Sequence, residues 1–492
     1  MKILLVYPEI PQTFWSFKKA LRFIAKKAAE PPLGLLTVAG LLPEEWEMKL
    51  VDLNVSPLSD EQILWADTVF LGGMSIQRRS FEAVATRCNR LGVKVVAGGP
   101  LCTMHHQELS GVDHFVLGEA EITLPRFLDD LRRGNARRIY TAEGFAPLAA
   151  APLPRWELLE MKKYATIDIQ YSRGCPYDCE FCSITTLYGH VPRTKATAQF
   201  LAELESLYAI GWRGAVFVVD DNFIGNRRKL KQDFLPALID WSRRHGYPFG
   251  FNTEVSIDLA DDGELIQLMV KAGFKMVFVG IETPDERGLA ECGKLQNRNR
   301  DLLQAVKTLQ RGGLDVSGGF IVGFDSDGPD IFERQIRFIQ NSGIVTAMVG
   351  LLNAPPGTRL YKRLQAENRI INTMSGDNMD GSLNFLPHMK PHLLMAGYRR
   401  ILRTIYSQEE YFARIKTFLA EYRLPDVPAP PLKRESIAAL FRAVWHLGIW
   451  EEGKRYFWKL VFYVLRHHRR KFPQAIQMAI YGYHFRALAA AV

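Results

Sequence analysis

Three of the six cysteines in this 492-residue chain stand close together on what the sequence predicts to be a loop. Cys175, Cys179 and Cys182 lie in the segment "SRGCPYDCEFC", directly after the strand-like run "ATIDIQY". The other three cysteines are isolated, and six in so long a chain do not make a disulfide framework. Three thiolates on one short loop are suited instead to converge on a metal centre.

The spacing CxxxCxxC separates two kinds of metal centre. Zinc sites usually take four ligands from paired CxxC units, and no fourth Cys or His stands at a suitable spacing here. Three thiolates on a cubane [4Fe–4S] cluster leave one iron without a protein ligand, open to a substrate or cofactor. The spacing therefore favours a catalytic cluster, with a structural zinc or a loop without metal as the alternatives.

The chain after the cysteines repeats a pattern of apolar run and helix. Together with the run before the cysteines, six units suit an open relative of the (β/α) barrel. In such folds the site faces the carboxyl ends of the strands, where polar residues gather here, so the cysteine loop lies in the predicted active site. The later runs are "GAVFVVDDNF", "FGFNTEVS", "KMVFVGIET", "VSGGFIVGFDSD" and "VTAMVGLLNAPPG".

Residues 1 to about 135 show the same alternation, with helices expected at 33–42, 81–91 and 123–133. Strands that are apolar throughout and separated by helices predict a doubly wound α/β domain, which binds ligands at the strand carboxyl ends. Glycine at these ends lets a large flat or phosphorylated ligand approach the backbone. No GxGxxG follows the first strand, which makes a dinucleotide site a weak prediction. The small and turn-forming residues there include Gly72, Gly73, Gly98, Gly99, Gly118 and Glu119.

Composition and charge divide the chain further. With 47% apolar and 23% charged residues it is globular, and no apolar run approaches the ~18 residues that cross a bilayer. We therefore expect a cytoplasmic protein with reduced thiols.

The net charge of +9 comes from the C-terminal part of the chain. From Tyr398 onwards there are 17 Lys and Arg against 7 Asp and Glu, which leaves 45 basic against 46 acidic residues before Tyr398. The predicted units are a doubly wound domain (1–140), a linker (141–163), the barrel (164–385) and a basic helical domain (386–492).

With the cysteine motif and the barrel together, the sequence resembles the radical S-adenosylmethionine (SAM) family. The resemblance implies that Cys175, Cys179 and Cys182 hold a [4Fe–4S] cluster whose open iron chelates SAM, and that reductive cleavage of SAM gives a 5′-deoxyadenosyl radical. Phe181, just before the last cysteine, belongs to the same motif.

Other residues match the family at strand ends. By the resemblance, Asp220, Asp221 and Asn222 contact the SAM amino group; the alternative is a helix N-cap. Glu254 and Glu282 suit the ribose hydroxyls or the amino group, or else form structural ion pairs. The strand with Gly318 and Gly319 resembles the one that lies along adenine, and "APPGTRLY" resembles the motif that closes the last barrel unit.

The doubly wound domain before this barrel resembles the cobalamin-binding subclass over about the first 385 residues. The loop with Gly98 and Gly99 and the loop with Gly118 and Glu119 match its usual loops. The second strand ends "VDLNVSP" and lacks the DxHxxG motif that supplies a histidine to cobalt, so cobalamin would bind without that ligand. Met74, Ser75 and Gln77 are expected to face the lower side of the corrin; the alternative is that they cap a helix.

This subclass implies a cobalamin-dependent C-methyltransferase that acts on an unactivated carbon and uses SAM both as radical source and as methyl donor. "GMSIQRRS" and "AEPPLGLLTVAGLLPEEW" resemble the group that includes the hopanoid 2-methylases, which suggests a lipid, an isoprenoid or another secondary metabolite as substrate. Two alternatives stay open: a radical SAM cyclase, mutase or anaerobic oxygenase that does not methylate, and a non-enzymatic carrier of cobalamin or electrons. No side chain is assigned as a catalytic acid or base.

The expected partners follow from the cluster and from the C-terminal charge. The cluster needs a reductant such as a flavodoxin or ferredoxin. The stretch "KRYFWKLVFYVLRHHRRKF" is a basic, aromatic-rich helix, which suits peripheral contact with an anionic membrane at its inner face. The alternative is that its aromatic residues pack on the barrel and its charges are a solvated face. No RNA-binding module is recognisable, so nucleic acid is not expected.

Overall fold

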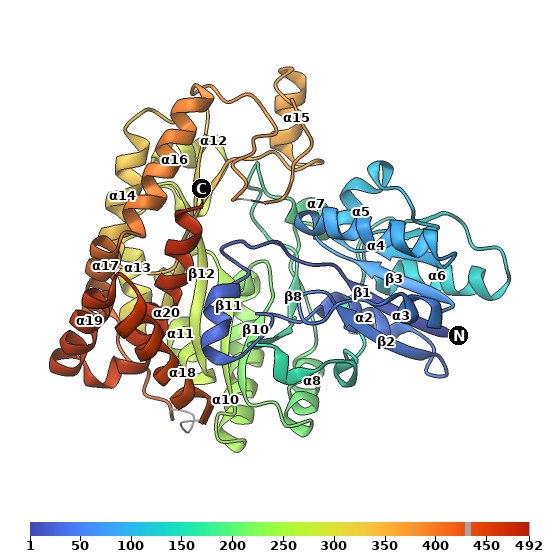
Figure 1. Ribbon diagram of the computed structural model, residues 1–492, viewed down its shortest axis with the longest axis horizontal. Helices are drawn as coiled ribbons and strands as arrows, with labels where there is room; N and C mark the ends of the chain where they lie inside the picture. The colour runs from blue at the N-terminus through green and yellow to red at the C-terminus, as the bar shows by residue number, and fades with distance from the viewer. Residues whose placement is uncertain (378, 429–433, 492) are drawn as a thin grey trace.

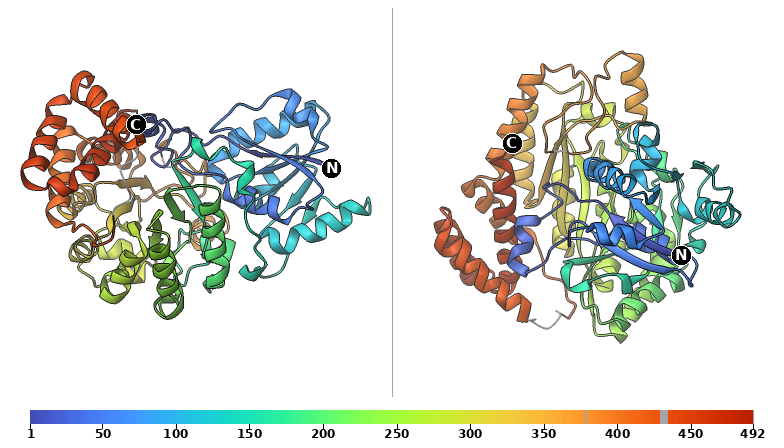
Figure 2. Two further views of the ribbon diagram at one scale, coloured as in Figure 1. Left: turned by 90° about the horizontal axis from the view of Figure 1, so that it is seen from below. Right: turned by 45° about the vertical axis from the view of Figure 1, so that its right-hand side comes forward.

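A computed structural model describes residues 1–377, 379–428 and 434–491 of the chain. The molecule has an N-terminal sheet with its helices at one end, a curled second sheet in the middle, and C-terminal helices on the far side of that second sheet (Figures 1 and 2). One large hydrophobic core is shared by the second sheet and the C-terminal helices, and two smaller cores cover the faces of the first sheet.

The N-terminal sheet has six parallel strands in the order β2-β1-β3-β4-β5-β6. Ile3 and Leu5 of β1 pack toward α2 and α6, while Leu4 and Val6 pack toward α3, α4 and α5. Because both faces are covered, the strand is apolar throughout, and the predicted doubly wound fold is confirmed. The strands are β1 (Lys2–Tyr7), β2 (Glu47–Asp52), β3 (Thr68–Gly72), β4 (Lys94–Gly98), β5 (His114–Val116) and β6 (Ile139–Tyr140).

The helices of this part are close to those expected from the sequence. The helix predicted at 81–91 begins earlier, because its first turn is polar and carries no apolar signal. The short strand β6 was not predicted, since two residues show no periodicity. The helices are α2 (Leu33–Leu41), α3 (Asp60–Trp65), α4 (Arg78–Arg90), α5 (Pro100–His105) and α6 (Ala120–Arg132).

The second sheet has six parallel strands in the order β14-β13-β12-β11-β10-β7. Since β7 and β14 are both edges, the sheet is an open half-barrel, as predicted from the six repeated units. Its strands are β7 (Thr166–Ile169), β10 (Gly214–Val218), β11 (Phe249–Val255), β12 (Phe274–Glu282), β13 (Asp315–Val322) and β14 (Ala347–Leu351). Its outer helices are α8 (Thr197–Ala209), α9 (Arg227–Lys229), α10 (Leu235–Arg244), α11 (Gly263–Ala272), α12 (Glu286–Glu291), α13 (Leu302–Gly312), α14 (Ile331–Ser342) and α15 (Arg359–Ala366).

The cysteine loop lies inside a small antiparallel hairpin. The hairpin strands are β8 (Ser172–Arg173) and β9 (Arg193–Thr194), and the short helix α7 (Ile184–Tyr188) follows the last cysteine. The hairpin therefore anchors both ends of the cysteine-bearing segment at the carboxyl end of β7.

The C-terminal helices cover the barrel on the side of β12 to β14 (Figure 1). The segment between β1 and α2 crosses from the N-terminal sheet to these helices: Phe14 packs on Tyr406 and Phe485, and α1 (Lys18–Leu21) packs on α20. Within the described residues no helix is long and apolar enough to span a membrane. The helices are α16 (Pro391–Ile405), α17 (Gln408–Glu421), α18 (Arg434–Trp445), η11 (His446–Trp450), α19 (Lys454–His467) and α20 (Phe472–Ala489).

The contact between α14 and α16 depends on a glycine. A Cβ atom at Gly397 of α16 would lie 2.2 Å from the Phe332 ring of α14. We therefore expect Gly397→Ala to lower the free energy of unfolding by about 1–3 kcal/mol, the usual cost of overpacking. The measurement is the shift of the denaturant midpoint.

Gly34→Ala is the matched control, because Gly34 also lies in a helix and its added Cβ would meet nothing within 4 Å. Its midpoint should stay the same or rise slightly, since alanine is the better helix former. A midpoint for Gly397→Ala equal to that of the control would contradict the close helix contact.

Candidate functional site

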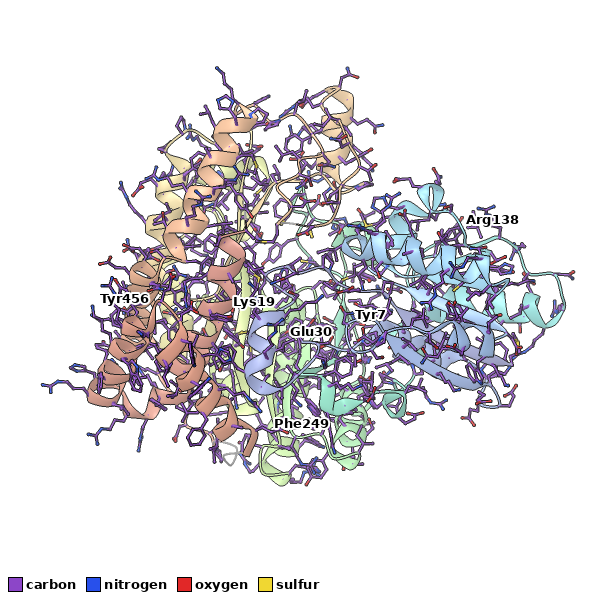
Figure 3. The ribbon with its side chains drawn as sticks, viewed as in Figure 1. Tyr7, Lys19, Glu30, Arg138, Phe249 and Tyr456 are labelled. Carbon is purple, nitrogen blue, oxygen red and sulfur yellow. The ribbon has the colours of Figure 1, made fainter. Side chains whose placement is uncertain are left out.

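One cavity of about 1010 Å³ separates the carboxyl ends of the two sheets. Tyr7 at the end of β1 and Glu30 in the crossing segment lie on its N-terminal side, between the sheet and the barrel (Figure 3). This central cavity is at or above the upper size of pockets that hold one drug-sized ligand, so it has room for more than one. From the barrel, each strand or its carboxyl end contributes lining residues: Asp168 and Gln170, Phe217 and Val219, Glu254, Phe278 and Gly280, Gly319 to Ile321, and Met348 to Leu351.

The cysteine loop is held by its own backbone. The N–H of Cys175 donates to the Gly189 carbonyl at 3.2 Å, and the N–H of Cys182 donates to the Cys179 carbonyl at 3.0 Å. Gly174 has a φ of +94°. A side chain there would approach three carbonyl oxygens at 3.0 Å, so the turn before the first cysteine requires glycine.

Each of the three sulfurs has a hydrogen-bond donor. The N–H of Tyr177 points at the sulfur of Cys175, and the N–H of Ile184 points at that of Cys182. Donors of this kind favour thiolates over thiols and are the environment of cluster ligands. The third contact is Gln296 Nε2, 3.9 Å from the Sγ of Cys179.

A buried cation balances the charge of this loop. Burial raises the pKa of the Cys182 thiol to about 12 and raises the pKa values of Cys175 and Cys179, while the charge of Lys294 opposes each shift. Burial acts against the charge of Lys294, but Glu282 and Cys179 hold its pKa well above the usual value. Lys294 Nζ lies 2.7 Å from Glu282 Oε1, so the cation reaches both the acid and the thiolates.

The donor set suits a cluster better than a single ion. Among the described residues no three His, Cys, Asp or Glu side chains are gathered tightly enough to hold one metal ion. A cubane cluster does not need such convergence, because each thiolate binds a different iron. Three free thiolates with donors and a nearby cation therefore fit a [4Fe–4S] cluster with one open iron.

Three of the predicted acids face the central cavity: Asp221, Glu254 and Glu282. Burial raises the pKa of Asp221 to about 6, and burial together with the charges of Asp221 and Glu30 raises the pKa of Glu254 to about 8. A cationic ligand would lower both values by stabilising the carboxylates. These acids therefore suit a ligand that brings a positive charge or hydroxyl donors.

Glu282 stands in a strained conformation at the end of β12. Its φ of +62° is uncommon for a residue other than glycine. Gln335 Nε2 holds its carbonyl at 3.0 Å, and Lys294 holds its carboxylate. Such strain persists only where the surroundings impose it, which is typical of ligand-binding positions.

Eight predicted residues are not among those that line the central cavity. Three of them are Cys175, Cys179 and Cys182, in the loop next to Phe181, and the structure gives the other five a structural contact instead. Asp220 accepts from the N–H of Tyr171 at 2.8 Å and from Ser172 Oγ at 2.6 Å. Asn222 hydrogen-bonds Ser256. Asp220 is not the N-cap considered as the alternative, because it ties the cysteine hairpin to the end of β10.

The other three lie in the sheet or at the edge of the N-terminal domain. Gln77 Oε1 accepts from the N–H of Met74, and its Nε2 donates to the Pro8 carbonyl at 2.6 Å, so it caps a turn. Glu119 forms an ion pair of 2.6 Å with Arg193. Gly318 faces away from the cavity, where a Cβ would meet Phe320 at 2.9 Å. The geometry favours framework roles over cofactor contact for these residues.

The remaining predicted residues do reach the central cavity. Phe181 lies beside the cysteines and packs near Phe324, with ring centroids 6.4 Å apart. From the N-terminal sheet the lining includes the glycine loops and the loop after β3 that carries Met74 and Ser75, and no histidine of the described chain is among the lining residues. The predicted residues that line it here are Met74, Ser75, Gly98, Gly99, Gly118, Gly319 and Phe181.

Sequence reasoning missed several groups that the structure brings to the site. Lys294 and Gln296 gave no signal, because they follow a short helix far from the cysteines in sequence. Asp168 did give a signal in the sequence, because it is a charged residue inside the apolar run "TIDI". Its Oδ1 is buried without a hydrogen-bond partner, and burial and the charge of Glu30 raise its pKa well above the usual value.

The far side of the central cavity is apolar. Trp15 of the crossing segment packs on Phe278 with ring centroids 5.0 Å apart. Together with the ends of β13 and β14 these residues form an apolar wall opposite the N-terminal sheet. The wall consists of Trp15, Phe278, Phe320, Met348, Val349, Leu351 and Met379.

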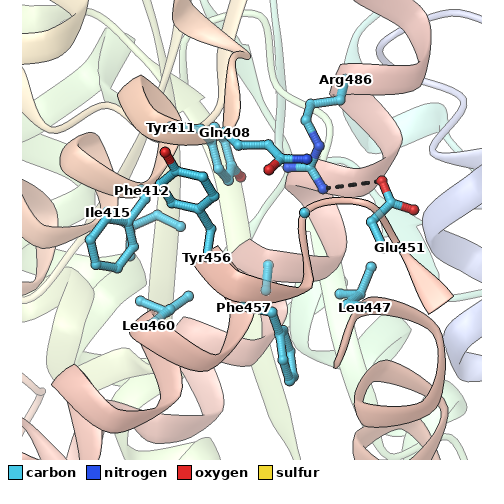
Figure 4. A pocket seen from close by; sticks show the side chains of 12 residues that line it. Gln408, Tyr411, Phe412, Ile415, Leu447, Glu451, Tyr456, Phe457, Leu460 and Arg486 are labelled. Carbon is cyan, nitrogen blue, oxygen red and sulfur yellow. Dashed lines mark ion pairs between the residues drawn. The ribbon is translucent and has the colours of Figure 1, made fainter. Parts of the chain in front are cut away.

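A second cavity, between α17, α19 and α20, is much smaller at about 40 Å³ (Figure 4). It is lined by residues such as Phe412 and Phe457, and Arg486 pairs with Glu451 at its edge at 3.8 Å. Its volume suits only one or two waters and is too small for a substrate.

Comparison with known families matches all three parts of the chain. Residues 25–128 match the B12 binding domain, residues 169–339 match the Radical SAM superfamily, and residues 358–492 match a domain of unknown function, DUF4070. The first two matches contain the glycine loops and the cysteine motif, which agrees with the cofactors expected from the sequence.

Two relatives cover nearly the whole chain. An uncharacterized methyltransferase of Synechocystis is 40% identical over 99% of this chain and 91% of its own. The hopanoid C-2 methylase of Rhodopseudomonas palustris is 34% identical over 93% of this chain and 88% of its own. Among solved structures, the radical SAM methyltransferase TsrM of Kitasatospora setae is 16% identical with a TM-score of 0.61, covering 100% of this chain and 99% of its own, which shows a shared fold.

The Glu282–Lys294 pair should tune the cluster's reduction potential. In Glu282→Gln the lysine keeps its charge without a counter-charge, which favours the reduced cluster. We expect the midpoint to rise by about 60 mV, the shift of a one-electron couple for 1.4 kcal/mol. The measurement is a redox titration by electron paramagnetic resonance (EPR) without SAM.

Lys294→Met is the opposing variant, because it removes the cation and should not raise the potential. Lys294→Arg keeps the charge and should leave the midpoint near that of the unchanged protein. Shifts of Glu282→Gln and Lys294→Met in the same direction would contradict the electrostatic role of the pair.

Proposed function

The chain belongs to the cobalamin-dependent radical SAM methyltransferases, and we propose that it methylates an unactivated carbon of an apolar, isoprenoid-type lipid. The observation that carries the substrate class is the apolar wall of the central cavity, which offers few partners to a polar substrate. The hopanoid C-2 methylase, similar over 93% of the chain, supports a lipid of this class. A methyltransferase is favoured over a non-methylating enzyme or a non-enzymatic carrier, because a methyltransferase and a methylase are similar over 99% and 93% of the chain.

The residues of the site have distinct tasks in this proposal. Cys175, Cys179 and Cys182 hold the [4Fe–4S] cluster, and the glycine loops of the N-terminal sheet admit the broad face of cobalamin. When bound, the cluster supplies the electron for cleavage of SAM, and cobalamin supplies the methyl group. Lys294 offsets the negative charge of the thiolates from within the protein.

The acids of the barrel orient SAM. Asp221, Glu254 and Glu282 face the cavity near the cysteine loop and accept from the SAM amino group or the ribose hydroxyls. Binding of a cation ionises them, since it lowers the raised pKa values of Asp221 and Glu254. The polar end of the cavity therefore holds SAM, which leaves the apolar wall for the substrate.

The apolar wall also keeps water and alternative hydrogen donors away from the reacting carbon. Trp15 and Phe278 close this side, and the buried residues of β13 and β14 leave it without exposed polar groups. A lipid carbon placed against the wall is thus held near the acids and the cysteines without competing contacts.

Two partners complete the proposal. A low-potential carrier such as a flavodoxin or ferredoxin reduces the cluster. The C-terminal helices contact a membrane peripherally, because an isoprenoid lipid is reached from a membrane.

The direct test of the function is anaerobic turnover. Protein reconstituted with iron, sulfide and cobalamin, supplied with SAM, a reductant and a pentacyclic isoprenoid lipid, should form S-adenosylhomocysteine and 5′-deoxyadenosine along with methylated lipid. Mass spectrometry of all three products is the measurement. Cys179→Ala should abolish all three, because the cluster loses a ligand.

Cys292→Ala is the matched control. Cys292 is buried like Cys179, but its Sγ donates to the Leu289 carbonyl at 3.7 Å and is committed to its helix. It should keep the cluster and the activity. Turnover by Cys179→Ala, or 5′-deoxyadenosine without S-adenosylhomocysteine, would overturn the methyltransferase proposal.

Cobalamin should bind without a histidine from the protein. No histidine of the described chain lines the central cavity, and the sequence lacks DxHxxG. The EPR spectrum of the cobalt(II) form should show no splitting from a protein nitrogen. Growth in ¹⁵N-labelled medium with unlabelled cobalamin is the control, because a nitrogen ligand from the chain would change the spectrum.

A further inference from the structure

Seven large apolar side chains on the outer surface of α18, η11 and α19 are exposed. Phe441 is 71% exposed, Trp450 is 70% and Phe462 is 66%, so these rings have almost no protein contact on their outer sides. Soluble surfaces seldom gather so many large apolar side chains in a run of 29 residues. This outer apolar patch consists of Ile437, Phe441, Trp445, Ile449, Trp450, Phe462 and Leu465.

The patch is one surface on a rigid support. Trp445 contacts Trp450 with ring centroids 6.1 Å apart, and Trp458 contacts Phe462 at the same distance. Trp458 Nε1 donates to the Gly448 carbonyl at 2.9 Å, which joins α19 to η11 between these two ring pairs. Ile437, Phe441 and Trp445 are spaced by four residues, so they share one face of α18.

The inner faces of the same helices form a separate core. Ala443, Leu447, Phe457 and Val461 are buried against Phe23 of the N-terminal segment and against α20. The aromatic residues of the "KRYFWKLVFYVLRHHRRKF" stretch therefore divide: Phe457 and Leu460 are buried, while Phe462 and Leu465 are exposed. The buried face of this helix packs as the second alternative expected of its aromatic residues, and the exposed face is left for an external partner.

The charge on the α19 side of the patch is positive, while Glu435 and Glu452 are exposed beside α18 and η11. From Gly453 to the end of the chain there are eight Lys and Arg and no Asp or Glu. Lys454, Arg455, Lys459, Arg466 and Arg469 are exposed on or next to α19. An apolar strip with tryptophans and a basic rim matches the boundary between acyl chains and anionic headgroups.

We propose that the outer apolar patch docks on an anionic lipid bilayer, with α18, η11 and α19 lying in the plane of the interface. A second copy of the chain fits less well, because a symmetric contact through this face would bring the two basic rims together. The helices α18 and α19, which carry the patch, lie on the side of the molecule away from the N-terminal sheet (Figure 1). A bilayer can therefore approach it without meeting the rest of the molecule.

The patch and the central cavity share one structural support. Residues Thr13 to Ser16 line the cavity, and seven to ten residues further along the chain Phe23 packs on His446 and on Tyr483, each with ring centroids 5.7 Å apart. Arg442 Nη1 of α18 donates to the Phe23 carbonyl at 2.8 Å. The crossing segment thus connects the helices that carry the patch with the lining of the central cavity.

The test is vesicle flotation with the full chain and no added substrate. Phosphatidylcholine vesicles with about one-third phosphatidylglycerol should carry the protein upward, and pure phosphatidylcholine vesicles should carry much less. Raising the salt to about 1 M, where the Debye length falls to about 3 Å, should release most of it. The double variant Phe441→Ser, Phe462→Ser should reduce flotation at least about tenfold, because two exposed rings leave the interface.

The matched control is Leu64→Ser, Ile210→Ser, which removes two exposed apolar side chains (59% and 50%) elsewhere on the surface and should float like the unchanged protein. The patch variant should keep its cluster spectrum, which shows that it folds. Equal flotation of the patch variant and the control would overturn the proposal. So would a dimer in solution that dissociates in the patch variant while no form floats, since the occupant would then be a second copy. Cluster content and turnover in detergent report on the proposed function separately.

Discussion

Two buried arginine–glutamate pairs fix the cysteine loop relative to the N-terminal sheet. Arg173 of β8 pairs with Glu121 at the start of α6 at 2.7 Å, and Arg193 of β9 pairs with Glu119 at 2.6 Å. Burial opposes the ionisation of Glu121, but its hydrogen bond with Arg173 lowers its pKa below the usual value. Because the cysteines lie between β8 and β9, these pairs hold both ends of their hairpin against the domain that carries the glycine loops.

These two ion pairs fix the geometry of the junction between the sheet and the barrel more than they stabilise the fold. A buried ion pair gains little over apolar packing, yet removing one partner leaves a buried charge that costs about 3–5 kcal/mol. Any slippage between the sheet and the barrel would break both pairs at once, so the distance across the central cavity is set within narrow limits. A radical reaction needs such a limit, since the reacting groups must be held at a defined distance from one substrate carbon. The Asp52–Tyr164 hydrogen bond of 2.9 Å fixes the opposite edge of the junction in the same way.

The sequence predicted every parallel strand except the short β6, and the position of the cysteine loop, because buried parallel strands leave continuous apolar runs. It also placed the acids at strand ends. It could not say which acids face the cavity, because that depends on side-chain direction and on partners distant in sequence. Asp220 and Asp221 are neighbours, yet the first ties down the hairpin and the second faces the cavity. The sequence placed Glu119 in a ligand-binding loop, because its ion-pair partner Arg193 is 74 residues away in the chain and gives no local signal.

The C-terminal helices show why the residues on the proposed substrate side of the cavity are harder to predict from the sequence than those on the cofactor side. Cofactor contacts come from short motifs at strand ends, whereas the apolar wall comes from ordinary residues of β12 to β14 and from Trp15. The wall's position depends on the helices behind it: Tyr406 Oη donates to the Ala347 carbonyl at 2.5 Å, and Arg414 donates to the Ile405 carbonyl at 2.6 Å between α16 and α17. No sequence motif marks these hydrogen bonds. A change in the helical region can therefore reshape the wall while the cysteine loop and the glycine loops stay in place, so one cofactor arrangement can serve methylation of different substrates.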